Sequence, residues 1–422
     1  MIFDVDKIRA RFPSLSMNDD GRQRVFLDGP GGTQVPQCVL NRMQDYLIRS
    51  NSNVGGSFRT SVSTDNLLLE TRAAMADFIN APLPSEIVFG SNMTTLTFSL
   101  SRALGHWMQP GDEIIITHLD HDANVVPWIQ LAQDRNLVIR WLDFHPNDCT
   151  LRMDRYESLL SSKTRLVAVG YASNAVGTIN PVREMADMAH GAGALVFVDA
   201  VQYMPHGPTD VEALSADFLV CSAYKFFGPH LGALWGRSEL LNQLPAYNVR
   251  PAGDQSPDKF ETGTQSYEAI AGTLGALEHI EWVGQQFGDA FTSEFPEFTD
   301  RRLNLHIGMA AIKAYEHGLS AHLTSGLDHL TGVKVWGITD PSRFRYRVPT
   351  VSFTIEGIHP RAVTDRLAEN NIFVWDGHNY AVEIMEQLGM ASTGGMVRVG
   401  SVHYNHTDEL DCMLDIVAQL AG

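Results

Sequence analysis

The chain has 422 residues, of which 44% are hydrophobic, and its formal net charge is −18. This length suggests two or three domains, and the negative charge argues against a nucleic-acid or anionic-membrane surface. The four cysteines form no CxxC motif, which argues against a disulfide framework or a zinc ribbon. The first ten residues carry acids and lack an apolar segment, and no window approaches a membrane span. We therefore expect a cytoplasmic protein.

The N-terminal part of the chain alternates short elements with polar turns. A brief strand over 24–28 runs into the glycine-rich turn 29–33, and a helix over 66–80 precedes a strand over 86–89. The turn 90–95 then enters a helix over 96–108. Backbone N–H groups, the helix dipole and the hydroxyls of Thr94 and Thr95 could seat a phosphate there, with an ordinary N-cap as the simpler alternative.

The middle of the chain predicts a parallel sheet. Apolar runs of strand length alternate with helical patterns, which is typical of α/β folds. The expected strands are 113–117, 138–144, 165–171, 194–198 and 218–221, the helices are 123–135 and 181–192, and a return strand at 232–237 precedes a helix over 265–287.

Two charged residues follow neighbouring strands of this predicted sheet. Asp199 ends one apolar run, and Lys225 lies just past the next, so both should lie at the carboxyl edge where α/β folds bind ligands. This pairing suits pyridoxal phosphate, which needs a lysine amine for its Schiff base and a carboxylate to keep its pyridine nitrogen protonated. The two histidines and two aspartates at 118–122 raise a metal alternative, but their order is unlike common zinc motifs and we expect no metal.

The pattern of predicted helices and strands changes from about residue 295. Helices over 301–316, 321–330, 360–370 and 407–420 alternate with short strands over 333–338, 350–355, 373–375 and 396–402. This pattern predicts an α+β domain rather than more parallel sheet. We expect a large domain over 21–290 and a smaller one formed by 1–20 and 291–422.

The segments VDAVQ, which contains Asp199, and SAYKFFGPH, which contains Lys225, resemble the class V aminotransferase and cysteine desulfurase branch of the fold-type I pyridoxal phosphate enzymes. The resemblance extends from Phe26 to Arg398. It implies an α/β large domain with a mostly parallel, seven-stranded type of sheet and a smaller α+β C-terminal domain.

The resemblance also implies roles for individual residues. Lys225 would carry the cofactor and move the substrate α-proton, Asp199 would pair with the pyridine nitrogen, and His121 would stack over the ring and move protons. The other implied cofactor positions are Thr94, Thr95, Ser222 and Tyr224 at the phosphate, Asn174 and Gln202 at the 3-oxygen, and Thr264 reaching the phosphate of the partner in a homodimer. Arg398 would hold the substrate α-carboxylate, and Arg59 is a further candidate substrate contact.

One loop departs from the family pattern. Trp375 to Ala381 aligns with an R-x-G-H-H-C-A loop that bears the sulfur-accepting cysteine of one desulfurase group, but Tyr380 stands in the cysteine's place and Trp375 replaces the arginine. We therefore expect an enzyme acting on an amino acid or small amine by C–S or other β-elimination, without a persulfide cysteine. Transamination is the second alternative, epimerisation the third, and a non-catalytic cofactor-binding scaffold the alternative from another class.

Overall fold

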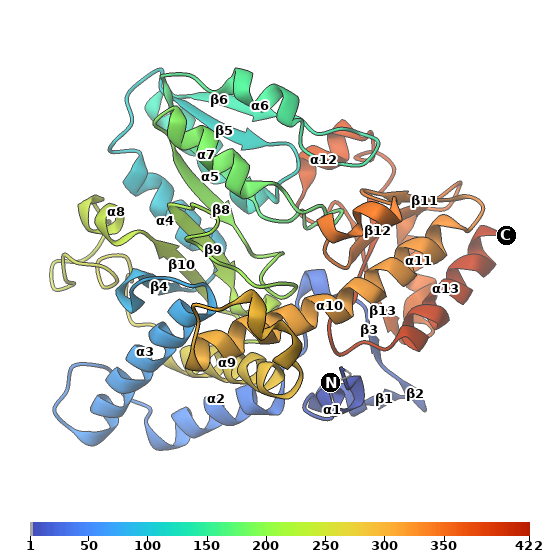
Figure 1. The fold of residues 1–422 in the computed structure, drawn as a ribbon, viewed down its shortest axis with the longest axis horizontal. Coiled ribbons are helices and arrows are strands. Elements are labelled where there is room, and N and C mark those ends of the chain that lie inside the picture. Colours follow the sequence, from blue (N-terminus) through green and yellow to red (C-terminus); the bar gives the residue numbers. More distant parts are fainter. Residues whose placement is uncertain (1–2) are drawn as a thin grey trace.

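A seven-stranded sheet forms the centre of the computed structural model, which describes residues 3–422 (Figure 1). Its strand order is β4-β10-β9-β8-β7-β5-β6, and only β10 runs antiparallel to its neighbours. The prediction of a mostly parallel α/β sheet is therefore confirmed. The strands are β4 (Ile87–Gly90), β5 (Glu113–Thr117), β6 (Val138–Leu142), β7 (Thr164–Gly170), β8 (Leu195–Asp199), β9 (Phe218–Ser222) and β10 (Gly232–Gly236).

Helices cover both faces of this sheet. Successive residues of β5 alternate between two cores, since Ile115 packs into one and Ile114 and Ile116 into the other. Helices α4 and α5 pack on one face, and α7 packs with α9, α2 and α3 on the other side. The helices of this part are α1 (Val5–Arg9), α2 (Gln37–Arg49), α3 (Arg59–Phe78), α4 (Met93–Leu104), α5 (Val126–Arg135), α6 (Met153–Leu159), α7 (Val182–Gly191), α8 (Ser238–Gln243) and α9 (Tyr267–Phe287).

A second, antiparallel sheet lies beside the first (Figure 1). Its strand order is β11-β12-β15-β14, and α10, α11 and α13 pack around its apolar core. The elements are α10 (Asp300–Asp328), β11 (Val333–Trp336), β12 (Thr350–Ile355), α11 (Pro360–Ala368), β14 (Trp375–Gly377), α12 (Val382–Gln387), β15 (Met396–Gly400) and α13 (Thr407–Ala421).

The N-terminal segment joins this second sheet. Strand β3 (Val25–Phe26) pairs in parallel with β13 (Ile372–Phe373), and β1 (Asn18–Asp19) pairs with β2 (Arg22–Gln23). Since β3 falls in the range expected for the large domain and β13 in that of the small domain, the limits 21–290 and 291–422 stay a prediction. Across residues 3–422, the helices lack the combination of length and apolar sequence that a bilayer crossing requires.

Helix α10 corrects one expectation. The sequence predicted two helices, 301–316 and 321–330, but the structure has a single helix of 29 residues. The gap between the two expected helices contains Gly318, and a glycine inside a helix costs about 1 kcal/mol relative to alanine. Leu319, Leu323 and Leu327 lie on the buried side just beyond it, at 0–2% exposure, and each contributes about 1.5–3 kcal/mol. The burial of these leucines therefore outweighs the cost of Gly318, and the helix continues through that residue.

Candidate active site

The residues predicted to carry the chemistry meet in one pocket at the carboxyl edge of the parallel strands. Asp199 is the last residue of β8, Lys225 lies in the short 3-10 turn that follows β9, and His121 follows β5. The pocket is lined by Met93, Thr94, Asp120, His121, Gly170, Ala172, Asn174, Asp199, Val201, Gln202, Tyr224 and Lys225.

Lys225 is 8% exposed, and its Nζ donates a hydrogen bond to the carbonyl oxygen of Pro30. Burial lowers the pKa of Lys225 to about 7; the nearby positive charge of Arg398 lowers it further, while Asp199 opposes the shift. A large fraction of Lys225 is therefore an uncharged amine near neutral pH, which is the form that attacks a carbonyl carbon.

The buried carboxyl groups of Asp199 and Asp120 line the same pocket as this amine, and burial raises their pKa values by different amounts. Burial raises the pKa of Asp199 to about 6, against a hydrogen bond from the Val201 amide to Oδ1 at 3.0 Å and the charge of Lys225. Burial raises the pKa of Asp120 to about 8. At neutral pH Asp199 is thus the ionised member and Asp120 largely the protonated one. The sequence raised Asp120 only within the metal alternative at 118–122 and not as a residue of the cofactor site.

His121 is held as a neutral ring. Its Nδ1 accepts a hydrogen bond from the amide of Ala123 at 3.0 Å, which leaves the ring proton on Nε2. Burial lowers the pKa of His121 to about 3, with Lys225 and Arg398 adding to the shift. The imidazole therefore presents an uncharged face and an Nε2–H donor at the pocket.

The N-terminus of α4 forms the end of the pocket nearest to β10. Thr94 lines the pocket, and Ser222 Oγ accepts a hydrogen bond from the amide of Met93 at 3.4 Å. A Cβ on Gly232 would collide with the Asn92–Met93 backbone, so glycine lets the helix end approach β10. These N–H groups, the dipole and the hydroxyls suit an anionic ligand.

Thr95 and Thr264 do not line this pocket. Asn92 caps α4, and its Oδ1 accepts hydrogen bonds from both the amide and the hydroxyl of Thr95 at 2.9 Å. Thr95 and Thr264 instead line an adjacent hollow together with Ser91 and His230. Within one chain, the structure brings Thr94 to the Lys225 pocket and Ser222 to the α4 N-terminus beside it, but it brings neither Thr95 nor Thr264 to the pocket.

Arg398 is buried on β15 next to this pocket. Its Nη1 donates to the carbonyl oxygen of Asn174 at 2.9 Å, and its Nε has no partner within the described chain. Burial lowers the pKa of Arg398 to about 10 and raises the pKa of the nearby Asp28 to about 6. Arg59 is exposed at the first residue of α3 and is not among the residues that line the pocket.

Comparison with known proteins decides the family. A sequence model of the family Aminotransferase class-V matches residues 25–304 and 301–413. The chain belongs to this family. Its class V relatives are pyridoxal phosphate enzymes, and the chain is a pyridoxal phosphate-dependent enzyme rather than a scaffold.

Three relatives show the extent of this similarity. The chain is 34% identical to the aminotransferase-like protein FGM3 of Gibberella zeae, over 97% of this chain and 96% of the relative. It is 32% identical to a probable cysteine desulfurase of Mycolicibacterium paratuberculosis, over 100% of this chain and 58% of that relative. The apo structure of a cysteine desulfurase from Thermococcus onnurineus superposes with a TM-score of 0.86 at 27% identity, covering 100% of this chain and 98% of that one.

The pocket of this class V family member fits pyridoxal phosphate. Two buried side-chain oxygens, Asn174 Oδ1 and Gln202 Oε1, have no hydrogen-bond partner within the described residues. Their amide nitrogens are committed to the Asn379 carbonyl at 2.8 Å and the Thr350 hydroxyl at 2.9 Å, so both oxygens stay available as acceptors for a ligand hydroxyl. The amine, the carboxylate, the acceptor oxygens and the α4 N-terminus thus suit the aldehyde, pyridine nitrogen, 3-hydroxyl and phosphate of the cofactor, and the His121 imidazole suits its ring face.

The lowered pKa of Lys225 predicts how cofactor loading depends on pH. Below pH 7 the amine is increasingly protonated, so the loading rate of cofactor-free protein should fall about tenfold per pH unit and level off above about pH 8. Stopped-flow absorbance of cofactor binding measures this rate, with Lys225→Ala as the control for unspecific uptake. A loading rate that stays flat between pH 5.5 and 8.5 would contradict the buried, uncharged amine.

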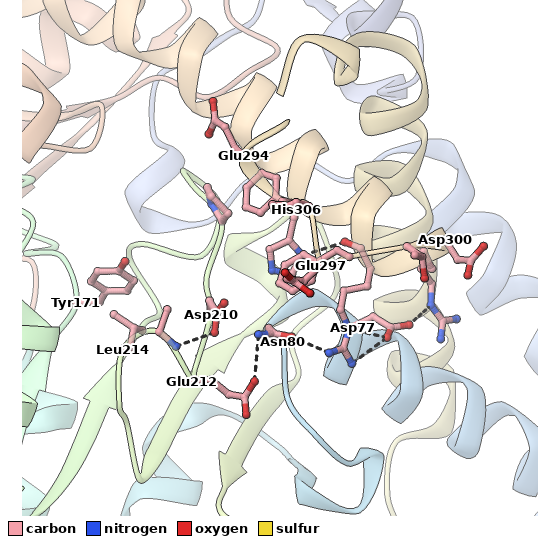
Figure 2. Close-up of a pocket in the computed structure, with 18 residues that line it drawn as sticks. Asp77, Asn80, Tyr171, Asp210, Glu212, Leu214, Glu294, Glu297, Asp300 and His306 are labelled. Atoms are coloured by element: carbon pink, nitrogen blue, oxygen red, sulfur yellow. Dashed lines mark hydrogen bonds and ion pairs between the residues drawn. The ribbon is translucent and has the colours of Figure 1, made fainter. Parts of the chain in front are cut away.

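A larger hollow of about 1180 Å³ lies elsewhere, beside the start of α10 (Figure 2). Carboxylates dominate its lining, among them Asp210, Glu297 and Asp300, and no lysine lines it. Its two arginines, Arg301 and Arg302, both bind Asp77. This hollow offers no nucleophilic amine among its lining residues, so the smaller Lys225 pocket is the better candidate for the cofactor site.

Proposed function

We propose that this class V enzyme is a lyase that eliminates a β-substituent, foremost a sulfur group, from an amino acid without forming an enzyme persulfide. The observation that carries the proposal is the Lys225 pocket itself. It combines a lysine that is partly uncharged near neutral pH with the carboxylate of Asp199, it lies next to Arg398, and no cysteine is among its lining residues. Elimination needs a base, an electron sink and a leaving group, whereas a desulfurase also needs a thiolate.

Each residue has a defined task in this proposal. Pyridoxal phosphate, when bound, supplies the electron sink, and Asp199 keeps a proton at its pyridine nitrogen. Arg398 holds the substrate carboxylate with its free guanidinium edge, and the Lys225 amine removes the α-proton. His121 covers the cofactor face and keeps water from it, and the thiolate leaves to solvent.

The four cysteines support the absence of a persulfide step. Burial raises the pKa values of Cys149 and Cys221 to about 12, and burial also raises the pKa of Cys38. Cys412 is exposed on α13, within the second sheet's helical cover rather than at the Lys225 pocket. Thiols that stay protonated are poor sulfur acceptors. We also propose that the protein is located in the cytoplasm, and the four free thiols support this location.

Incubation with L-cysteine tests the persulfide step. We expect pyruvate, ammonia and sulfide in solution, with less than about 5% of the protein gaining the mass of one sulfur. The reason is that Tyr380 stands in the position of the sulfur-accepting cysteine, and a phenol does not accept sulfur as a thiolate does. Intact-protein mass spectrometry and product assays measure both quantities. Alanine as the product, together with a sulfur adduct on any of the four cysteines, would make the chain a desulfurase.

Transamination is the second candidate, because the relative FGM3 carries the name aminotransferase-like. The same pocket residues would then return the α-proton to a different carbon, and the amino group would stay with the cofactor. A panel of amino acids separates the reactions: ammonia with pyruvate indicates a lyase, a keto acid equimolar with enzyme indicates a transaminase, and loss of optical rotation alone indicates an epimerase.

The working unit we propose is a homodimer with a shared active site. Thr264 is exposed, and it shares a hollow with Ser91 and Thr95 beside the α4 N-terminus, so a second chain can meet the phosphate end there. Loss of one hydrogen bond to a charged group in Thr264→Ala should weaken cofactor retention roughly 10- to 150-fold. Dialysis followed by cofactor absorbance measures this, with Thr292→Ala as the matched control. A monomer by light scattering that keeps its cofactor tightly would contradict the dimer.

A further inference from the structure

Two large aromatic side chains stand exposed beside the Lys225 pocket, and the elimination chemistry does not use them. Trp375 is 50% exposed and Tyr380 is 67% exposed. Both come from the loop in which the sequence departs from the desulfurase pattern. Large aromatic surface facing water next to a pocket commonly marks a binding surface.

Trp375 lies against the segment that contacts the reactive lysine. It pairs directly with Arg398 across β14 and β15. A Cβ added at Gly31 would collide with the indole nitrogen of Trp375, so the ring packs on Gly31. The preceding residue, Pro30, accepts the hydrogen bond of Lys225 Nζ. The indole of Trp375 therefore packs on Gly31, the residue next to Pro30, whose carbonyl oxygen accepts the hydrogen bond of Lys225.

Tyr380 is fixed over His121 by its backbone. Its carbonyl accepts a hydrogen bond from the amide of Asp122 at 2.7 Å, and the carbonyl of the preceding Asn379 accepts one from Asn174 at 2.8 Å. Its phenol ring stacks toward the His121 ring with a centroid distance of 5.6 Å and an interplanar angle of 22°. These two hydrogen bonds thus tie the loop to Asn174, which lines the pocket, and to Asp122, which follows the pocket residue His121.

The backbone at this loop is strained, which indicates that the placement of the ring matters. Asn379 and Tyr380 both adopt left-handed conformations, with φ of 51° and 57°. A tyrosine rarely occupies this region, and such strain concentrates at ligand-binding sites.

We infer that Trp375 and Tyr380 form the two walls of a subsite for the substrate side chain, and that the preferred substrate carries an aromatic group on its β-sulfur. The inference rests on the proposed elimination. The methylene and thiol of cysteine are too small to cover either ring, whereas an aryl or benzyl thioether can lie against both. The carboxylates Asp122 and Glu383 lie close to each other at this loop and disfavour an acidic side chain.

The reaction inferred for such a substrate balances with water alone. The α-proton is removed, the bond between the β-carbon and sulfur breaks, and the sulfur leaves with the bonding electrons and gains a proton. One S-aryl-cysteine and one water give one thiol, one pyruvate and one ammonium ion. No oxidant or reductant is consumed.

Binding of unreactive analogues tests the subsite separately from catalysis. 3-(Phenylthio)propionate and 3-(methylthio)propionate carry the carboxylate and thioether but no amine. Calorimetry on the cofactor-loaded enzyme should show that the phenyl analogue binds at least about tenfold more tightly than the methyl analogue. This difference corresponds to one aromatic contact with Trp375 and one with Tyr380. Trp375→Ala and Tyr380→Ala should each reduce this preference to below about threefold, while Tyr247→Ala, an exposed tyrosine outside the site, should leave it unchanged.

The outcomes separate this inference from the proposed function. A phenyl preference that is absent, or that persists in both alanine variants, overturns the subsite, even if the enzyme releases thiol from S-methyl-cysteine. A phenyl preference that both variants abolish supports the subsite, even if S-phenyl-cysteine releases no thiophenol, in which case the elimination proposal fails instead. If neither analogue binds, the subsite is overturned.

Discussion

Replacing Lys225 with alanine is expected to lower turnover by at least about 10³-fold, because the variant loses both the amine that carries the cofactor and the base that moves the α-proton. The fold should survive, since an alanine removes a buried amine whose hydrogen-bond partner is the Pro30 carbonyl. Initial rates of pyruvate and ammonia release measure the effect.

Lys259→Ala is the matched control for this variant. Lys259 is 6% exposed, comparable to Lys225, and its Nζ donates to the Asn242 carbonyl at 3.0 Å outside the pocket. It should keep turnover within about threefold of the unmodified enzyme, as expected for a substitution outside the reacting groups. Equal losses in the two variants would indicate a structural effect and would remove Lys225 from its catalytic role.

Asp199→Asn is the second change with a large expected effect. Asparagine can still accept the hydrogen bond from the Val201 amide, but it cannot hold a proton at the pyridine nitrogen as an ionised carboxylate does. The kcat should fall by about 10²-fold or more, while the cofactor stays bound through Lys225 and the α4 N-terminus. Steady-state kinetics and the cofactor absorbance spectrum report the two quantities separately.

The control for this variant is Asp210→Asn. Asp210 accepts the hydrogen bond of the Ala213 amide at 2.8 Å at the hollow of Figure 2, away from Lys225. The Asp210→Asn substitution should leave kcat unchanged. A kcat for Asp199→Asn within threefold of the unmodified enzyme would show that the carboxylate does not support the electron sink.

The sheet and the centre of the site could be predicted because both depend on local signals. Strands buried on both faces appear as apolar runs, so the isoleucine run within Glu113–Thr117 was predicted with the bounds of β5. Residues Thr350–Ile355 alternate between polar and apolar side chains, and they were predicted with the bounds of β12. The ends of parallel strands meet at one edge, so the order of the chain was enough to bring Asp199 and Lys225 together.

The rest of the site depends on contacts between distant segments, which the sequence does not display. Asp120 and Asp28 became relevant only because the fold buries their carboxyl groups. The partner of the Lys225 amine is a backbone carbonyl, at Pro30, which has no sequence signal. Thr95 was expected at the phosphate, yet the cap formed by Asn92 takes its hydroxyl.

Some elements also escaped prediction because tertiary packing overrides local pattern. The strand expected over 373–375 is divided, since β13 pairs with β3 while β14 pairs with β15 in a different sheet. The helix expected to begin at residue 66 begins at Arg59, where the polar, hydroxyl-rich turn of α3 buries Ser61 and Thr64.

Borohydride reduction followed by peptide mapping tests most directly whether Lys225 carries the cofactor. Reduction fixes pyridoxal phosphate covalently to the amine that holds it, and mass spectrometry of the digest then locates that amine. We expect the reduced adduct on the peptide that contains Lys225, in near-stoichiometric amount. An adduct on Lys163 or Lys259, or no adduct at all, would show that Lys225 does not carry the cofactor.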